Sequence, residues 1–531
     1  MTRPSDPPSP SEGATDPATD QDEVFRTLSD PATHGMSDPI KRIDTHAAAV
    51  FLAGPNAYKV KKAVRFPFMD QSTLELRRHA CEAEVAINRR FTPELYLGVV
   101  PVTRMDKKLR IGGSGEPVEW MVHLKRFDET KTLDLVADRG EITPQMIARI
   151  ATLILESHRA ATVGDGDVAT KELGGVVEET LTELLEAPAI FPPERADTLA
   201  DAMRAAYRDV RDLLLQRGAS SRVRRCHGDL HLRNIALLER GPVLFDAIEF
   251  SESIATTDVL YDLAFALMDL WERRLRLEAN LLLNRYFWGC DDPPTELAGL
   301  AALPLFMSLR ASVLAKIAAI RFRDVDQAPA TRAEALRYFD TACELFDSAR
   351  PTLIAIGGLS GSGKTTLAAR LAPFLGRAPG AVHLRSDIER KRLFGVAELD
   401  PLPQSAYRLE VTEEVFARLR AMAETTLRAG HSVIVDAVHR TPQERALVRA
   451  VADRAGAPFV GLWLDAPIDV LIRRIAERTG DASDATAAVV ADQAREPPGA
   501  IDWTRLDAAV SLENLVRRAA AAHSDIEPPH A

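Results

Sequence analysis

The stretch Gly358-Leu359-Ser360-Gly361-Ser362-Gly363-Lys364-Thr365 fits the pattern G-x-x-x-x-G-K-T without a gap. It follows the apolar run 353–356 and precedes a helix-like segment that begins at Thr366. In such a loop the glycines let backbone N–H groups wrap phosphates, the lysine reaches the terminal phosphates, and the last hydroxyl binds Mg²⁺. A chance turn rich in Gly and Ser would lack this strand and this helix. The sequence therefore predicts an ATP or GTP site formed by 358–365 and Thr366, with Thr365 as a magnesium ligand.

Short apolar runs alternate with helix-like segments around this loop. The runs are 353–356, 381–384, 433–435 and 459–464. Such alternation is typical of a parallel sheet that is covered by helices on both faces. We therefore expect an α/β domain of the P-loop class.

An aspartate at the end of one run favours a kinase over a motor protein. Asp436 follows 432–435, where a second-strand carboxylate would hold magnesium directly or through water. A hydrolysing ATPase usually has a glutamate directly after this aspartate, whereas Ala437 stands here. Asp387 follows the preceding strand, whose end faces the catalytic crevice of such a sheet. We predict that Asp387 orients the acceptor hydroxyl; a plain helix N-cap is the alternative for this residue.

Arginines complete the predicted site. Arg385 or Arg390 is expected to bind substrate, since both lie close to the acceptor-orienting aspartate in sequence. Arg478 precedes the Gly-, Asp- and Ser-containing segment 479–485, and this pattern is typical of a lid whose arginine stabilises the transferring phosphoryl group. Helical arginines are often solvated, which is the alternative for Arg478. The region 351 to about 520 resembles the small-molecule P-loop kinases, close to gluconate kinase and zeta-toxin-like kinases.

A second signature lies upstream, where His227-Gly228-Asp229 is followed by Asn234 and then by Asp246. In kinase-type phosphoryl transfer one aspartate orients the acceptor hydroxyl, while an asparagine and a second aspartate bind magnesium. The segment 235–242 has the size of a hairpin that would return Asp246 beside Asn234. This arrangement resembles the aminoglycoside phosphotransferase family, whose protein-kinase-like fold has His-Gly-Asp where protein kinases have His-Arg-Asp. The resemblance implies Asp229 as catalytic residue and Asn234 and Asp246 as metal ligands.

The segment before this signature is consistent with an ATP-binding lobe. The runs 48–52 and 57–62 are strand-like, and Ala57-x-Lys59 matches the kinase Ala-x-Lys pattern. We predict Lys59 as the nucleotide-binding lysine, with Lys61 in reserve, and Glu84 on the next helix as its partner. A solvated glutamate is the alternative for Glu84. No G-x-G-x-x-G loop precedes this lysine, so the sequence leaves open whether this site catalyses phosphoryl transfer.

A zinc site is a different interpretation of the same signature. His227, Asp229 and His231 include two histidines at i and i+4, a spacing that suits zinc on a helix. The signature precedes a hairpin-like segment instead of lying within a long helix, and no glutamate follows His227. We therefore predict a structural or loop role for His231.

Composition agrees with a fusion of domains. The chain has 531 residues, and about 150 residues per domain suggests roughly three structural units. Its net charge is −11, and the sequence contains no long run of Lys or Arg. Nucleic acid would therefore meet no general electrostatic attraction. The four cysteines form no C-x-x-C pair, which indicates neither a disulfide framework nor a zinc site. Neither a basic-then-apolar leader nor a long apolar run is visible, and we expect a cytoplasmic location without a membrane partner.

We expect four segments along the chain. Residues 1–38, rich in Pro, Ser, Asp and Thr, are predicted to be a disordered tail. Residues 39–350 are expected to form the aminoglycoside-phosphotransferase-like kinase domain, 351–523 the P-loop kinase domain, and 524–531 a disordered C-terminus. Beyond the tail, the chain resembles bacterial two-domain proteins that pair these two kinase types, which implies an α/β multidomain fold with an α+β N-terminal part.

The motifs and the resemblance lead to one functional expectation. The chain is predicted to be an ATP- and Mg²⁺-dependent kinase that transfers the γ-phosphate to a hydroxyl of a small metabolite, with two nucleotide sites. Its expected partner is a small-molecule substrate and not nucleic acid. Two alternatives remain open: one domain is a nucleotide-binding regulatory module, or the first domain phosphorylates protein. The short segment between Asp246 and Asp258 disfavours a long peptide-docking loop.

Overall fold

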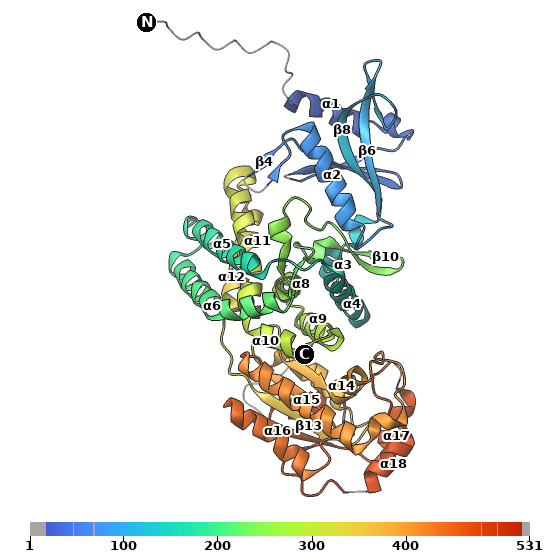
Figure 1. The fold of residues 1–531 in the computed structure, drawn as a ribbon, viewed down its shortest axis with the longest axis vertical. Coiled ribbons are helices and arrows are strands. Elements are labelled where there is room, and N and C mark those ends of the chain that lie inside the picture. Colours follow the sequence, from blue (N-terminus) through green and yellow to red (C-terminus); the bar gives the residue numbers. More distant parts are fainter. Residues whose placement is uncertain (1–16, 46, 67–68, 479, 496, 523–531) are drawn as a thin grey trace. The chain divides into compact units, whose positions relative to one another are not determined.

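The strands form one six-stranded antiparallel sheet, one five-stranded parallel sheet and smaller pairs (Figure 1). The structure, a computed structural model, describes residues 17–45, 47–66, 69–478, 480–495 and 497–522. By packing, the chain divides into two compact units. The first unit comprises Met1–Arg139, His227–Asp229 and Arg233–Ala255, and the second comprises Gly140–Cys226, Leu230–Leu232 and Thr256–Ala531. This division is one of packing, and the domain boundaries at 39, 350 and 523 remain predictions.

The antiparallel sheet of the first unit has the strand order β1-β2-β3-β8-β6-β7. Its strands are β1 (Lys41–Asp44), β2 (Ala48–Ala53), β3 (Asn56–Lys61), β6 (Tyr96–Met105), β7 (Lys108–Ile111) and β8 (Glu116–Lys125). The other elements are α1 (Pro17–Ser29), β4 (Arg65–Phe66), β5 (Met69–Asp70), α2 (Leu74–Asn88), α3 (Leu133–Asp138), β10 (Ile235–Leu238), β11 (Gly241–Leu244), α7 (Glu252–Ala255) and 3-10 turns at Pro31–His34 and Glu129–Lys131. Ala53 pairs with Asn56, so Gly54 and Pro55 form a two-residue turn that leads into β3.

Helix α1 shares a buried core with the antiparallel sheet. Val24, Phe25 and Leu28 are buried in one cluster with Phe51 of β2. The separate cluster formed by α2 includes Val85. Burial of three large apolar side chains is a substantial gain for a helix of this length, at about 1.5–3 kcal/mol for each side chain that becomes fully buried.

The predicted N-terminal tail is wrong for the described part of residues 1–38. Residues 17–38 include α1 and the 3-10 turn. Ordering such a polar segment costs conformational entropy, and burial of its apolar side chains against the sheet offsets this cost. The rest of that predicted tail, 1–16, lies outside the described residues. The predicted C-terminal tail, 524–531, also lies outside them.

Helices dominate the second unit up to residue 344. They are α4 (Pro144–Ala160), α5 (Gly166–Leu185), α6 (Pro193–Ala219), α8 (Val259–Glu272), α9 (Arg276–Gly289), α10 (Pro293–Ala298), α11 (Leu303–Arg321) and α12 (Pro329–Glu344), with β9 (Val223–Arg225) paired to β12 (Thr256–Asp258), a 3-10 turn at Gly299–Ala302 and a π-helical turn at Phe322–Asp326. The segment Pro293–Val325 is long and apolar enough to cross a membrane by length and composition alone. Its most apolar window is 78% buried inside the protein, as expected for a core helix.

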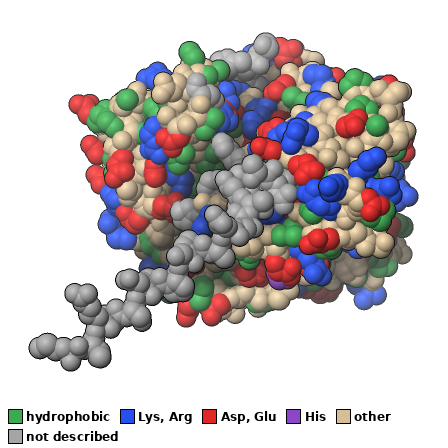
Figure 2. Space-filling model, turned by 90° about the horizontal axis from the view of Figure 1, so that it is seen from above, with side chains coloured by type: hydrophobic (Ala, Val, Ile, Leu, Met, Phe, Trp, Pro, Cys, Tyr) green, Lys and Arg blue, Asp and Glu red, His purple; other side chains and the backbone are tan. Residues whose placement is uncertain are grey.

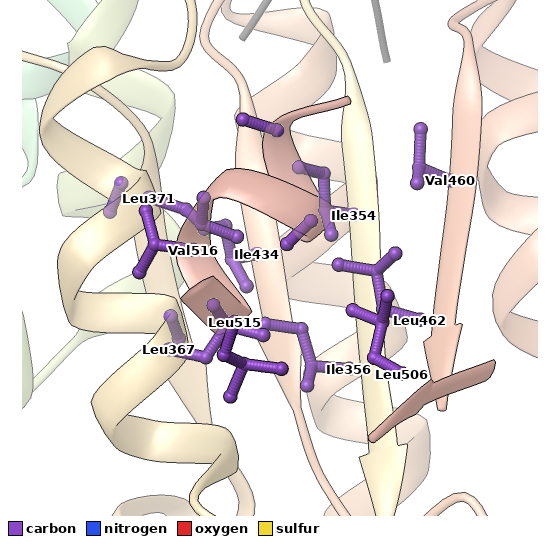
Figure 3. Close-up of a cluster of buried hydrophobic side chains, with 14 of the residues drawn as sticks. Ile354, Ile356, Leu367, Leu371, Ile434, Val460, Leu462, Leu506, Leu515 and Val516 are labelled. Atoms are coloured by element: carbon purple, nitrogen blue, oxygen red, sulfur yellow. The ribbon is translucent and has the colours of Figure 1, made fainter. Parts of the chain in front are cut away.

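The parallel sheet of the second unit has the order β14-β15-β13-β16-β17. Its elements are β13 (Leu353–Gly358), α13 (Lys364–Leu371), β14 (Val382–Arg385), α14 (Ser386–Leu393), α15 (Leu409–Arg428), β15 (Val433–Asp436), α16 (Pro442–Ala455), β16 (Phe459–Asp465), α17 (Ile468–Glu477), α18 (Ala487–Arg495), β17 (Thr504–Asp507) and α19 (Leu512–Ala520), with 3-10 turns at Ala372–Phe374 and Gln404–Tyr407. Side chains of α13 and α19, such as Leu367 and Leu515, pack with Ile356 and Leu462 of the sheet in one buried cluster (Figure 3). The predicted parallel α/β fold is confirmed.

Charged side chains of both signs occur on the face drawn in Figure 2. On the face drawn in Figure 2, acidic and basic side chains are interspersed instead of gathering by sign. This distribution is in keeping with a chain of modest net charge, −11 over 531 residues.

Candidate active sites

In the first unit, the lysine in the middle of β3 lies between two carboxylates. Lys59 Nζ is 3.0 Å from Oε1 of Glu84 on α2 and 2.6 Å from Oδ1 of Asp246, which follows β11. The structure thus brings together three residues that the sequence analysis selected from three separate segments. Glu84 is fully buried, so the alternative of a solvated glutamate is wrong.

The reserve lysine contacts the same glutamate. Lys61 lies two residues after Lys59 on the same face of β3, and it forms ion pairs with Glu84 and Glu249. Burial on its own would raise the pKa of Glu84, but the two lysines outweigh burial and lower this pKa to about 2. Sequence analysis missed Glu249; its signal was a carboxylate three residues after Asp246 in an otherwise apolar run.

The backbone at Asp246 is held in an unusual conformation. Its φ is 59°, in the left-handed region that few residues other than glycine adopt. The Asp246 N–H donates to the hydroxyl of Tyr96 at 3.0 Å, and Tyr96 is itself buried. Strain of this kind persists only where the surroundings impose it, and this contact helps to hold the backbone from which the Asp246 carboxylate projects.

The His-Gly-Asp segment lies in the same unit. Asn234 Nδ2 donates to Oδ2 of Asp229 at 2.9 Å and to its backbone oxygen at 2.8 Å. His227 Nε2 donates to the backbone oxygen of Phe245 at 2.9 Å, one residue before Asp246. β10 and β11 form the predicted hairpin between Asn234 and Asp246. Amide and carboxylate oxygens from Asn234 and Asp246 are the donor set that Mg²⁺ prefers.

The structure does not favour zinc at this signature. The bonded Nε2 of His227 is directed to a backbone oxygen, and its ring packs against Phe91 with centroids 5.3 Å apart. The ring of His231 packs edge-on against Phe265 at 5.3 Å. These contacts are those of structural histidines.

The P-loop of the second unit turns at its glycines. Gly361 and Gly363 have φ of 81° and 92°. A Cβ at Gly361 would lie 2.7 Å from the backbone oxygen of Leu471, so this position requires glycine. The buried hydroxyl of Ser362 has no hydrogen-bond partner among the described residues. A glycine-rich loop at a helix N-terminus, with an unused buried hydroxyl, is a fit for nucleotide phosphates.

Lys364 and Thr366 both lie in the first turn of α13. Lys364 Nζ donates to the backbone oxygens of Gly358 and Leu359, each at 3.0 Å, so it lies across the loop. Burial lowers the pKa of Lys364, and the nearby carboxylates of Asp436 and Asp387 oppose this shift. The lysine and both predicted catalytic-site aspartates therefore belong to one cluster.

Thr365 and Asp436 meet at the carboxyl end of the sheet. Thr365 Oγ1 donates to Oδ2 of Asp436 at 2.7 Å, and His383 Nε2 donates to the same oxygen at 3.2 Å. Burial would raise the pKa of Asp436, but the hydrogen bond from His383 and the charges of Lys364 and Arg385 lower it to about 2. A hydroxyl and an ionised carboxylate side by side suit Mg²⁺ as predicted ligands.

Asp387 lies in the first turn of α14. Arg385 occupies the N-cap position of this helix, and no side chain caps it, so the alternative of a plain N-cap for Asp387 is wrong. Burial raises the pKa of Asp387, against the opposing charges of Arg385 and Lys364. A carboxylate with a raised pKa beside a lysine and an arginine can accept a proton, as the predicted role requires.

The predicted arginines have internal partners. Arg385 Nη2 donates to Oδ2 of Asp481 in the predicted lid at 2.9 Å. Arg390 lies over the ring of Tyr407, 5.0 Å from its centroid. Arg478 donates to the backbone oxygen of Ser483 at 2.7 Å. Arg385 and Arg478 therefore contact the predicted lid, and Arg478 is not the solvated alternative. Thr479, within the predicted lid, lies outside the described residues.

A residue of α18 contacts the P-loop directly and was missed by sequence analysis. The backbone N–H of Ser360 donates to Oε1 of Gln493 on α18 at 2.9 Å. No local pattern marks Gln493, since its relation to the P-loop arises only from the fold. An amide hydrogen of the P-loop is thus occupied by a side chain from α18.

Comparison with known proteins agrees with this two-part organisation. The model described as "Phosphotransferase enzyme family" matches residues 71–303, and that described as "AAA domain" matches residues 353–498. "Uncharacterized protein Rv2004c" of Mycobacterium tuberculosis is 30% identical over 496 residues, which are 90% of this chain and 94% of that protein. The adenylyl-sulfate kinase of Myxococcus xanthus is 33% identical over 123 residues, 23% of this chain and 62% of that protein. The structure of a choline/ethanolamine kinase family protein from Mesorhizobium loti covers 62% of this chain and 95% of its own, at 16% identity and a TM-score of 0.39.

The fold and both clusters of residues define a protein with two kinase-type parts. The chain belongs to the same family as the mycobacterial relative, and it joins an aminoglycoside-phosphotransferase-like domain to a P-loop kinase domain. Both parts are of families that support phosphotransferase activity, and kinases of these families generally use ATP and Mg²⁺.

Proposed function

We propose that the protein transfers the γ-phosphate of ATP to a hydroxyl of a small metabolite and that it has two nucleotide sites. The observation that carries this proposal is the hydrogen bond from Thr365 Oγ1, directly after the P-loop lysine, to Oδ2 of Asp436 at 2.7 Å. These are the two groups with which P-loop enzymes hold Mg²⁺. Asp387, with its raised pKa, belongs to the same cluster, which favours a kinase over a hydrolysing motor.

In the P-loop site each residue has a role in this proposal. Bound Mg²⁺ would supply charge compensation between the phosphates, held by Thr365 and Asp436. Lys364 and the backbone amides of the loop would bind the phosphates. Asp387 would orient the acceptor hydroxyl and accept its proton, and Arg478 would stabilise the negative charge of the transferring group.

The first unit offers a second set of the same kind. Lys59, positioned by Glu84, would bind the nucleotide phosphates, and Asn234 and Asp246 would bind magnesium. Asp229, which accepts a hydrogen bond from Asn234, would orient the acceptor hydroxyl. This assignment gives the chain two kinase sites of unrelated architecture.

A second candidate function applies to the first unit. Lys59 forms ion pairs with Asp246 and with Glu84, so the lysine is already paired with a residue that is predicted to bind metal. Together with the lack of a glycine-rich loop before β3, this favours a module that binds nucleotide and regulates, without transferring phosphate. Loss of product in an Asp229→Ala variant would count against this candidate.

The acceptor is proposed to be a small alcohol. A partial relative is named adenylyl-sulfate kinase, and this likeness supports phosphoryl transfer to a small molecule at the P-loop site. We further propose a cytoplasmic protein whose partners include neither nucleic acid nor a membrane, in line with its interspersed surface charges (Figure 2).

The test is ADP release in the presence of sugars, sugar acids, amino alcohols and aminoglycosides. Wild type is compared with Asp229→Ala and Lys364→Ala, and with Asp453→Ala and Lys171→Ala as exposed controls. We expect one acceptor to stimulate ADP release, and one of the two site variants to abolish that stimulation while the controls retain it. ATP binding without stimulation by any acceptor would favour the regulatory candidate.

A further inference from the structure

The edge strand of the parallel sheet, β14, is completed by a helix from the helical part of the same unit. β14 pairs with β15 on one side only. On its open side, α9 presents Asn280, Asn284 and Trp288, which are spaced four residues apart and so share one helix face. An edge strand normally leaves a row of backbone groups without partners. Here the side chains of α9 supply those partners.

The contacts centre on His383. Its backbone N–H donates to Oδ1 of Asn284 at 2.7 Å, and its backbone oxygen accepts from Nε1 of Trp288 at 2.7 Å. Asn284 and Asn280 also donate to the backbone oxygen of Ala381, at 3.2 and 3.0 Å. Both backbone groups of His383 are therefore satisfied by α9, and this residue is fixed more firmly than an ordinary edge residue.

His383 in turn contacts the proposed metal ligand. Its Nε2 lies 3.2 Å from Oδ2 of Asp436, and its ring packs edge-on against Trp288 with centroids 5.5 Å apart. His383 and Asp436 are buried, and Trp288 is half-buried. A continuous path of contacts leads from Trp288 through His383 to Asp436 and then to Thr365.

Helix α9 also holds the segment that carries Asp387. Arg392 on α14 donates to the backbone oxygens of Phe287 and Trp288, at 3.0 and 2.9 Å, at the end of α9. The guanidinium of Arg385 lies 5.3 Å from the ring centroid of Trp288. Trp288 thus touches both residues of β14 that point toward the P-loop site and its lid, His383 and Arg385.

We propose that Trp288 and Asn284 are positioning residues of the P-loop site, which set the orientation of Asp436 through His383 and so make Mg²⁺-dependent nucleotide binding depend on α9. This inference rests on the proposed function of the P-loop site. Groups that orient a metal ligand typically contribute about 10–100-fold to metal affinity, although they do not touch the ion.

The test uses the full-length chain with Lys59→Ala in every protein, so that the remaining ATP binding comes from the P-loop site. ATP binding is titrated with Mg²⁺ and with EDTA. Trp288→Phe removes the indole N–H but keeps an aromatic ring. Trp271→Phe is the matched control, because Trp271 of α8 donates to Glu344.

We expect Trp288→Phe to weaken binding of ATP with Mg²⁺ by about tenfold and to leave binding in EDTA within about twofold. Trp271→Phe should change neither, and thermal unfolding of both variants should match. A purely structural defect would weaken both titrations together. Asn284→Ser should repeat the selective loss, which keeps the test decisive if Trp288→Phe folds poorly.

Two results would overturn the inference, and they differ. If the parent protein shows binding that Lys364→Ala abolishes, and Trp288→Phe and Asn284→Ser keep its ratio of EDTA to Mg²⁺ dissociation constants, only this inference fails. If Lys364→Ala changes nothing in the parent, the P-loop site does not bind ATP. The proposed function of that site then fails, and the positioning role fails with it.

Discussion

The hydroxyl of Thr365 donates a 2.7 Å hydrogen bond to the carboxylate of Asp436. These residues come from α13 and β15, which are separated in sequence by the strand β14 and the helices α14 and α15. Their contact exists because β13 and β15 are neighbours in a parallel sheet, whose strands end at the same edge. The pair is therefore formed by the fold before any ligand binds.

Replacing Thr365 tests this pair. Thr365→Val keeps the shape of the side chain but removes the hydroxyl, so the proposed magnesium site loses one ligand. We expect binding of ATP with Mg²⁺ to weaken at least about tenfold, with little change in EDTA. Thr365→Ser retains the hydroxyl and should bind as wild type does. Isothermal titration in the Lys59→Ala background measures both, and equal binding by the Val and Ser variants would contradict the pair's role.

Asp387 is expected to act in chemistry and not in nucleotide binding. Asp387→Asn keeps the size of the side chain and removes its ability to accept a proton. We expect acceptor-dependent ADP release at the P-loop site to fall about 10²–10⁴-fold, with ATP affinity unchanged. Asp492→Asn, an exposed change on α18, is the control. A parallel loss of ATP affinity in the Asp387 variant would assign the residue to nucleotide binding instead.

Sequence is most informative where chemistry depends on local spacing. The P-loop, the His-Gly-Asp signature and the alternation that directs Lys59 and Lys61 to one face of β3 are all visible over a few residues. Glu249 carries a weaker local signal. Gln493 and Trp288 carry none, because each acts on a segment more than eighty residues away in the chain. The tail was wrong for a similar reason: Val24, Phe25 and Leu28 gain stability only from the sheet that covers them.

Shortening Leu28 tests the packing of α1 on the sheet. Leu28 is fully buried, and Leu28→Ala should destabilise the first unit by about 2–5 kcal/mol. Hydrogen exchange in peptides from β2 and β3 should accelerate accordingly. Arg26→Ala, on the exposed side of the same helix, should have an effect of at most about 0.5 kcal/mol. Unchanged exchange in the Leu28 variant would mean that α1 does not stabilise this sheet.

A buried ion-pair cluster in the second unit should be intolerant of change. Arg217 Nε lies 2.7 Å from Asp258, and its Nη2 lies 3.0 Å from Glu296. Arg217→Met leaves the buried carboxylate of Asp258 without its cation and leaves Glu296 with Arg222 alone. It should cost about 3–5 kcal/mol, seen as a lower urea midpoint. Arg204→Met removes an exposed pair with Glu178 and should cost at most about 1 kcal/mol. Similar midpoints for the two variants would contradict the burial of this cluster.

Acid should weaken the second unit through His431. Burial, with a smaller effect of the charge of Arg377, lowers the pKa of His431 to about 3, and its Nε2 donates to the backbone oxygen of Leu300. The unfolded chain binds a proton at this residue below about pH 6.5, whereas the folded protein does not until about pH 3. The stabilising contribution is therefore complete above pH 6.5 and is lost as the pH falls, by about 1.4 kcal/mol per pH unit. His431→Gln keeps a donor without the titration, so the unfolding free energy of this variant should decline less steeply between pH 6 and 4 than that of wild type. His79→Gln, at an exposed position, should leave the slope unchanged, and equal slopes for all three proteins would contradict the assignment.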